Sequence, residues 1–227
     1  RNIKYGADLI KTCSTGGVLS KGTKVGAPQY TVEELTALID EAHSHGLKVA
    51  SHAHGAEGII NALIAGADTI EHASFIDDEG IRLAIENNAA LSMDIYVTEY
   101  ILGEGANAGI LEESLEKERM TGATQRSNFR KAVEAGATIV FGTDAGVYPH
   151  GQNAKQFSRM TRFGMTPLQA LQSATTVAAE VMGLGYDIGK IKAGYTADFV
   201  AVKGNPIEHI ELLEVPSAVI KGGVRHR

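Results

Sequence analysis

Four residues with metal-binding or proton-transferring side chains stand where short apolar runs of this 227-residue sequence end. They are Lys11, His52, His72 and Asp144. Singly, each has an ordinary explanation, because a histidine at a strand end is usually structural, a lysine is usually at the surface, and an aspartate can cap the next helix. Together, two imidazoles, a carboxylate and an amine suit a borderline divalent ion, and zinc is favoured. The joint pattern therefore predicts a metal site.

The elements that would position these residues alternate between apolar runs and amphipathic stretches. Strands are expected at 7–13, 47–51, 68–71, 89–93 and 137–141, and helices from the capping box of Thr31 and Glu34 to Gly46 and then at 56–65, 78–88, 107–135, 153–163, 167–173 and 177–182. Strands alternating with helices indicate βα units around a parallel sheet. The loops after parallel strands meet on one side of the sheet, so we expect the four side chains to converge there.

The character of the chain changes near residue 186. Short β-type runs separated by turns follow, in IGKIKAGYTADFVAVKGNP and SAVIKGGVRH. We therefore divide the chain into an α/β part over 1–185 and a small β segment of about three strands over 186–227.

The composition limits the kinds of partner and environment that the protein can have. The net charge is −6 without a basic block, which argues against a nucleic-acid surface. No apolar run approaches the roughly 18 residues that a membrane-spanning helix needs. Cys13 is the single cysteine, which excludes an intrachain disulfide and a thiolate zinc cluster. The sequence is compatible with a homo-oligomer.

The ammonium group of lysine repels a cation, so lysine can be a metal ligand only after its charge changes. Carboxylation of the amine by CO₂ makes that change, because it gives an anionic carbamate. The segments IKTCSTGGVLS, SHAHG, TIEHASF and VFGTDAG resemble the amidohydrolase superfamily, particularly its prolidase-like and imidazolonepropionase-like members. The tail resembles the β-sandwich segment of those enzymes. The resemblance implies a (β/α)8 TIM-type barrel, with strands 4–8 in residues 1–185, followed by β-sandwich residues.

The resemblance also implies a role for each strand-end residue. Lys11 matches a carboxylated lysine that bridges two divalent ions in the complete protein, with zinc as the expected metal. His52 and His72 match the histidines of the fifth and sixth barrel strands, which hold the more exposed ion. Asp144 matches the eighth-strand aspartate, which binds the more buried ion and transfers a proton. In SHAHG we choose His52 over His54, because His52 finishes the strand.

The reaction that the resemblance implies is hydrolysis of an amide bond in a small-molecule or dipeptide substrate by a metal-activated water, by a dipeptidase or carboxypeptidase of the Xaa-Pro dipeptidase type. A cyclic amide hydrolase of the imidazolonepropionase type is one alternative, against which Lys11 argues, since that reaction usually goes with a mononuclear site. A non-catalytic scaffold on a degenerate amidohydrolase fold is another. Further candidates for contact with substrate are His54, Tyr96, Tyr148 and His150.

One expected motif is absent from this sequence. The family has a His-x-His pair after its first barrel strand, whereas the pairs here are His43/His45, at a helix end, and His52/His54, after the fifth strand. Three barrel strands are also unaccounted for. We therefore expect the chain to be the C-terminal portion of a longer protein. Its localisation stays open, with the cytoplasm favoured over the periplasm or secretion.

Overall fold

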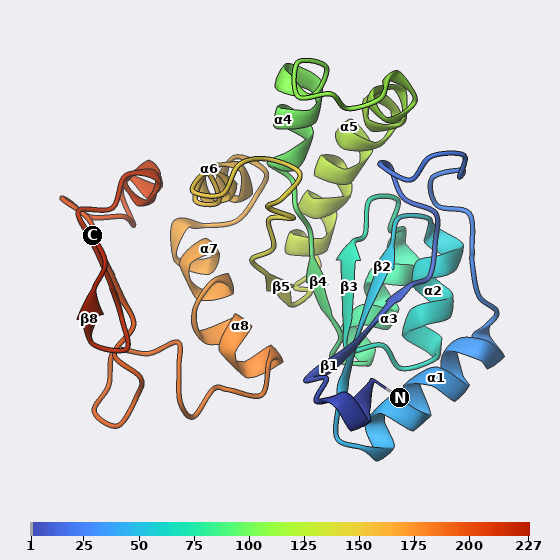
Figure 1. Cartoon of the computed structure of the whole chain (residues 1–227), viewed down its shortest axis with the longest axis horizontal. Helices are drawn as coiled ribbons and strands as arrows, with labels where there is room; N and C mark the ends of the chain where they lie inside the picture. The colour runs from blue at the N-terminus through green and yellow to red at the C-terminus, as the bar shows by residue number, and fades with distance from the viewer. Residues whose placement is uncertain (1) are drawn as a thin grey trace.

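A computed structural model describes residues 2–227 of the chain (Figure 1). Its centre is a five-stranded parallel sheet in the order β1-β2-β3-β4-β5. The strands are β1 (Leu9–Cys13), β2 (Lys48–Ala53), β3 (Thr69–His72), β4 (Ala90–Ser92) and β5 (Ile139–Val140). All five expected strands are present, with ends shifted by a few residues. Within the described residues β1 and β5 are the two edges, so this part of the barrel is open.

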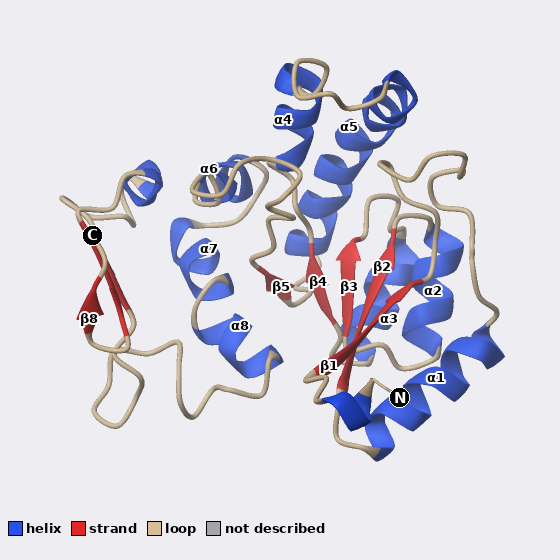
Figure 2. Cartoon of the chain, in the orientation of Figure 1, coloured by secondary structure: helices blue, strands red, loops and turns tan. Residues whose placement is uncertain are grey.

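Helices α1 (Val32–Ser44), α2 (Ala56–Ile64) and α3 (Asp78–Glu86) connect the first four strands and cover one side of the sheet (Figure 2). The capping box that opens α1 is present, with the Thr31 hydroxyl accepting from the amide of Glu34. Gly46 follows the helix with φ 71°, a conformation that glycine adopts without strain. Each of these helices therefore joins two neighbouring parallel strands of the sheet.

Alternation along the strands separates a core side from a site side. In β2 the side chains of Val49, Ser51 and Ala53 are buried, while those of Ala50 and His52 are only partly covered. Because successive side chains of a strand point to opposite faces, Ala50 and His52 face away from the helices. The buried side forms the main core with apolar side chains of α1–α3, among them Ile39, Ile59 and Leu63. Each contributes about 1.5–3 kcal/mol through removal from water.

The connection between β4 and β5 differs from the sequence prediction of one helical region over 107–135. The structure has two helices, α4 (Val97–Glu104) and α5 (Glu112–Glu134). Gly105 and Gly109 lie in the segment between them, and Gly109 adopts φ 84°. Both helices rise beyond the carboxyl ends of the strands (Figure 1), where they can form a wall beside the predicted site.

The remaining elements follow β5. Helices α6 (Lys155–Arg162), α7 (Pro167–Ser173) and α8 (Thr176–Val181) lie close to their expected positions. The tail forms the expected three-stranded sheet, which is antiparallel and consists of β6 (Phe199–Ala201), β7 (Ala218–Lys221) and β8 (Val224–Arg225). Short 3-10 helices lie at Ile3–Tyr5 and Ile210–Glu214. The division at residue 186 stays a prediction. Among the helices within residues 2–227, none combines the length and hydropathy of a membrane crossing.

Candidate active site

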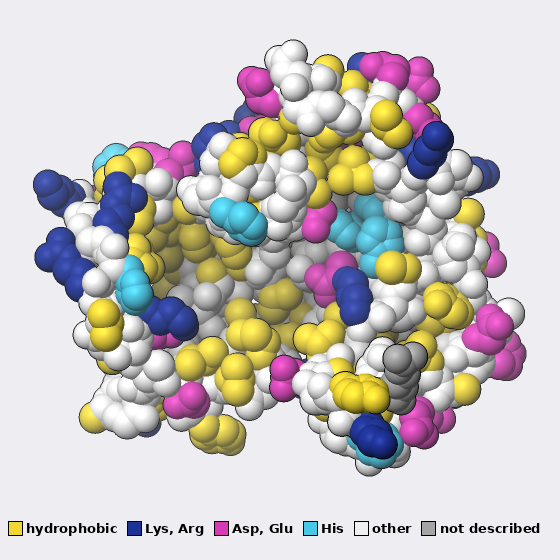
Figure 3. Space-filling model, in the orientation of Figure 1, with side chains coloured by type: hydrophobic (Ala, Val, Ile, Leu, Met, Phe, Trp, Pro, Cys, Tyr) yellow, Lys and Arg dark blue, Asp and Glu magenta, His cyan; other side chains and the backbone are white. Residues whose placement is uncertain are grey.

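Three histidine rings meet at the carboxyl ends of β2 and β3. The ring centre of His72 lies 4.6 Å from that of His52 and 4.7 Å from that of His54. One ring nitrogen from each of the three lies within 4.8 Å of the others. Figure 3 shows the histidine side chains gathered in a hollow beside acidic and basic groups. The three imidazoles can therefore donate to one ion.

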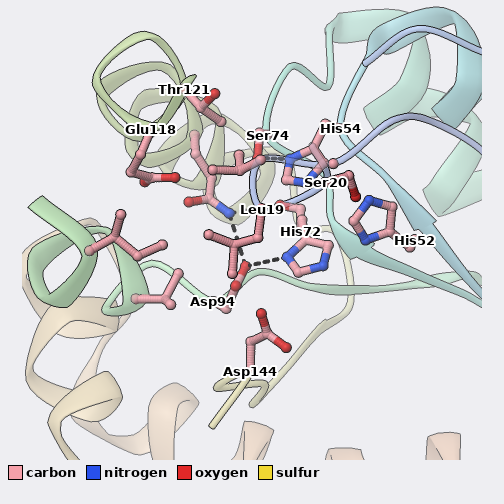
Figure 4. Close-up of a pocket in the computed structure, with 15 residues that line it drawn as sticks. Leu19, Ser20, His52, His54, His72, Ser74, Asp94, Glu118, Thr121 and Asp144 are labelled. Carbon is pink, nitrogen blue, oxygen red and sulfur yellow. Dashed lines mark hydrogen bonds and ion pairs between the residues drawn. The ribbon is translucent and has the colours of Figure 1, made fainter. Parts of the chain in front are cut away.

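A second donor group shares His72 with the first. One ligand atom each from His72, Asp94 and Asp144 lies within 4.8 Å of the others. Figure 4 shows the Asp144 carboxylate directed toward the ring of His72. The structure thus brings together three of the four predicted ligands, His52, His72 and Asp144, and adds His54 and Asp94.

The backbone at these strand ends is unusual. His72, Ala73 and Asp144 have φ values of 69°, 48° and 49°, in the left-handed region that residues other than glycine seldom adopt. At His72 this conformation ends the regular alternation of β3. Such conformations are held by the surrounding structure and cluster at functional sites.

Lys11 lies on the same face of the sheet as His52. In the parallel register Lys11 is paired with Ala50, and Cys13 is paired with His52. Lys11 is therefore two residues, about 7 Å, below the level of His52 along the strand direction. Its side chain is exposed on the edge strand β1. Its positive charge contributes to the pKa values of His52, His72 and Asp144, so it belongs to the same electrostatic environment.

Burial keeps two of the imidazoles neutral. It lowers the pKa of His52 to about 4, helped by the charges of His72 and Lys11. The same causes, burial first and then His72 and His52, hold the pKa of His54 well below its usual value. A neutral imidazole has the free lone pair that metal binding requires. At pH 7 these two rings are therefore ready to act as donors.

His72 and Asp94 behave as a pair. Burial opposes ionisation of His72, but the carboxylate of Asp94 outweighs it and raises the pKa of the ring. Burial likewise opposes the ionised form of Asp94, yet the charge and hydrogen bond of His72 bring the pKa of that carboxyl to about 2. Burial, followed by the charge of Asp94, raises the pKa of Asp144. Asp144 can thus exchange a proton more readily than an ordinary aspartate.

Asp94 and Gln125 belong to the site but were not predicted from the sequence. The Nδ1–H of His72 donates to Oδ1 of Asp94 at 3.0 Å, and Asp94 is 4% exposed. The Gln125 amide donates at 3.1 Å to that same oxygen and at 3.1 Å to the carbonyl of His72. Nδ1 of His54 lies 2.8 Å from the Ser74 hydroxyl. A carboxylate on one ring nitrogen fixes the orientation of an imidazole whose other nitrogen binds a metal. Asp94 follows the strand at 89–93, so the strand-end rule could have found it.

We expect Asp94→Asn to weaken metal binding at His72 by about 10–100-fold, the usual cost of removing such a carboxylate partner. The amide keeps the size of the side chain but loses the charge that holds the Nδ1–H of His72. Metal affinity measured by competition with a chromogenic chelator checks this. Asp40→Asn, an exposed change on α1, is the control. Equal affinity in Asp94→Asn and the native protein would contradict the role of Asp94.

The aromatic candidates lie outside the cavity. Tyr96 and Tyr148 are 5% and 1% exposed and pack edge to face, with ring centres 5.0 Å apart. They form a second apolar cluster with residues of α4, and the Tyr96 hydroxyl donates to Gln152 at 3.0 Å. Their burial leaves little surface for substrate, in contrast to the sequence prediction. His150 is exposed and does not line the cavity around the histidines.

The cavity around the donors has two walls. One is the loop after β1, from Gly17 to Ser20, and the other consists of residues of α4 and α5, including Val97, Ile101 and Glu118. A Cβ on Gly17 would lie 3.0 Å from Nε2 of His52, so glycine allows this loop to approach the ring. His54 lines the cavity, and its contact with substrate stays a prediction.

A family model described as the amidohydrolase family matches residues 1–225. The chain belongs to this family. The ochratoxinase of Aspergillus niger is 34% identical over 226 residues, which are 97% of this chain and 46% of the relative. The imidazolonepropionase of a Geobacillus species is 26% identical over 75% of this chain and 37% of its own length.

The solved structures agree with this assignment. A crystal structure of a Xaa-Pro dipeptidase with methionine bound in its active site matches with a TM-score of 0.94 and 42% identity. The match covers 99% of this chain and 56% of that protein. The family and the α/β barrel fold expected from the sequence are therefore confirmed. The chain spans about half the length of the relatives that it matches.

Proposed function

We propose that this amidohydrolase cleaves the amide bond of a dipeptide or an N-acyl amino acid with a metal-activated water. The observation that carries the proposal is the convergence of His52, His54, His72 and Asp144 on one cavity. The Xaa-Pro dipeptidase structure, at 42% identity, supports a peptide substrate.

The donor set fits a divalent ion on its chemistry. Imidazole and carboxylate are the groups that zinc prefers, and His72 belongs to both groups of donors. We propose that these two groups of donors would hold divalent ions and that Lys11, once its amine is carboxylated by CO₂, would add an anionic oxygen donor. When bound, a divalent ion polarises the scissile carbonyl and lowers the pKa of a water from 15.7 to about 7.

The protein groups then have separate tasks. The Asp144 carboxylate takes the proton from the attacking water and delivers it to the leaving nitrogen. Its raised pKa brings it closer to the range in which one group can serve as base and then as acid. Asp94 and Gln125 hold the His72 ring in one orientation. The apolar walls at Val97 and Ile101 keep bulk water from the scissile bond.

Two other functions remain as alternatives. Hydrolysis of a cyclic amide, as in imidazolonepropionase, is favoured less, because that relative is 26% identical and Lys11 has no task in a mononuclear site. A non-catalytic scaffold is also favoured less, because such a protein has no use for buried neutral imidazoles that face a cavity.

A substrate panel tests the proposal. The native protein, prepared with zinc, is assayed with Xaa-Pro and other dipeptides, N-acyl amino acids and cyclic amides. We expect turnover of at least one linear class, loss of turnover with a chelator, and return with added metal. Turnover of cyclic amides alone, or of nothing in a fully metal-loaded protein, would overturn the proposal.

A further inference from the structure

A buried carboxyl group on α5 has no task in the reaction described above. Glu118 is 4% exposed, yet it lines the same cavity as the histidines. In Figure 4 its carboxyl group extends from the helix into the cavity, on the far side from His52. Buried carboxyl groups are costly unless they are paired, so a position of this kind calls for a partner.

The charge of the neighbouring Arg126 acts on Glu118, but the two side chains form no close ion pair. The Arg126 guanidinium forms its ion pair with Glu99, at 3.7 Å, and donates to the carbonyl of Ile95. A Cβ on Gly122 would lie 2.9 Å from both Oε1 of Glu118 and Oγ1 of Thr98, so glycine keeps room for the two oxygens. Burial raises the pKa of Glu118 to about 7, and the Thr98 hydroxyl and then the charge of Arg126 oppose that shift without cancelling it. A cation from outside the protein would stabilise the ionised carboxylate.

The position of Glu118 along α5 indicates which cationic group of a substrate could reach it. Gln125, which contacts Asp94 and His72, lies seven residues later in the same helix, about 10.5 Å along the axis. Glu118 is thus two turns further from the strand ends than the groups that hold the donors. A substrate group bound there is separated from the scissile amide by several bonds, which suits the end of a long side chain better than an α-amino group.

The cavity around the donors and Glu118 has an apolar part, which lies beside polar groups such as Thr121 and Gln125. Leu19, Val97 and Ile101 line this part of the cavity. Lysine and arginine lay their methylene stems along apolar surface and present the charge at the tip, so this combination of walls and acid complements them. We propose that Glu118 determines substrate specificity by binding the cationic end of a lysine or arginine side chain. That side chain belongs to the residue next to the scissile amide. This inference rests on the proposed function.

The experiment compares matched substrates. Dipeptides with lysine at either position are paired with the same dipeptides carrying norleucine, which has the stem without the charge. We expect the native protein to favour lysine at one position, and Glu118→Gln to reduce the lysine-to-norleucine ratio of kcat/KM at least about tenfold. Glutamine keeps the size and shape of the side chain and removes its charge. Glu116→Gln, an exposed change of the same charge on the same helix, should leave the ratio unchanged.

The outcomes are distinguishable. An unchanged ratio in Glu118→Gln, or an equal fall of both rates with a lower melting temperature, would make Glu118 a structural residue and overturn the inference. Cleavage of neutral dipeptides with no preference for lysine would also overturn it while leaving the proposed function intact. Absence of any dipeptide cleavage would overturn the proposed function and this inference with it.

Discussion

The Asp144→Asn variant is expected to lose a factor of about 10²–10⁴ in kcat, the usual contribution of a positioned acid–base group. Asparagine cannot accept the proton from water or return it to the leaving nitrogen. It does tolerate the left-handed backbone conformation at this position, where φ is 49°, so the loss would not come from backbone strain. The measurement is kcat for the best dipeptide of the panel, with circular dichroism as a check of folding.

Asp40→Asn is the matched control for this change, because Asp40 is exposed on α1. The metal content of both variants is measured with the kinetics, since Asp144 is also a proposed donor. An Asp144→Asn enzyme that is metal-loaded and turns over at the native rate would show that another group transfers the proton.

The second large effect is expected at Lys11. If its carboxylated form bridges the two ions, Lys11→Ala should lose at least one ion per chain and most of the activity. Added bicarbonate together with a short carboxylate such as acetate should restore part of both, because the small anion can occupy the space of the side chain. Metal analysis and kcat with and without the anions are the readouts.

Lys203→Ala, an exposed change in the tail, serves as the control for loss of a positive charge. Carboxylation requires the neutral amine, so metal content of the native protein should also fall as the pH is lowered. Full metal content and activity in Lys11→Ala would refute the bridging role and leave the imidazole and carboxylate donors as the whole site.

The residues of the site that stand at strand ends could be predicted from the sequence, because their positions follow from local sequence patterns. An apolar run that ends on a polar side chain, followed by an amphipathic stretch, places that side chain at the carboxyl end of a parallel strand. This rule located His52, His72 and Asp144, which the structure brings to one cavity or its rim. It applied equally to Asp94, which follows β4 directly.

The rest depended on contacts between distant parts of the chain. Tyr96 and Tyr148 are close in sequence to strand ends, yet they pack against each other and α4 because burial of two large rings outweighs exposure to the cavity. The choice between His52 and His54 was not resolved by the strand boundary. β2 ends at Ala53, and the turn that follows brings His54 beside His72 as well.

Glu118 and Gln125 could not be predicted from the sequence for a similar reason. They lie on a polar helix, where a carboxylate and an amide are unremarkable in the sequence. Only the packing of α5 over the carboxyl ends of β3 and β4 places them beside the donors. A sequence pattern gives the face of a helix, but not the element that the face meets.

Metal analysis of the native protein before and after chelation, with amide hydrolysis measured on the same samples, tests the central claim most directly. We predict about two divalent ions per chain, loss of hydrolysis as they are removed, and return of hydrolysis as zinc is added back. The His72→Ala variant should bind neither ion tightly, because His72 belongs to both donor groups. Full hydrolysis by the metal-free protein, or unchanged metal content in His72→Ala, would contradict this account of the site.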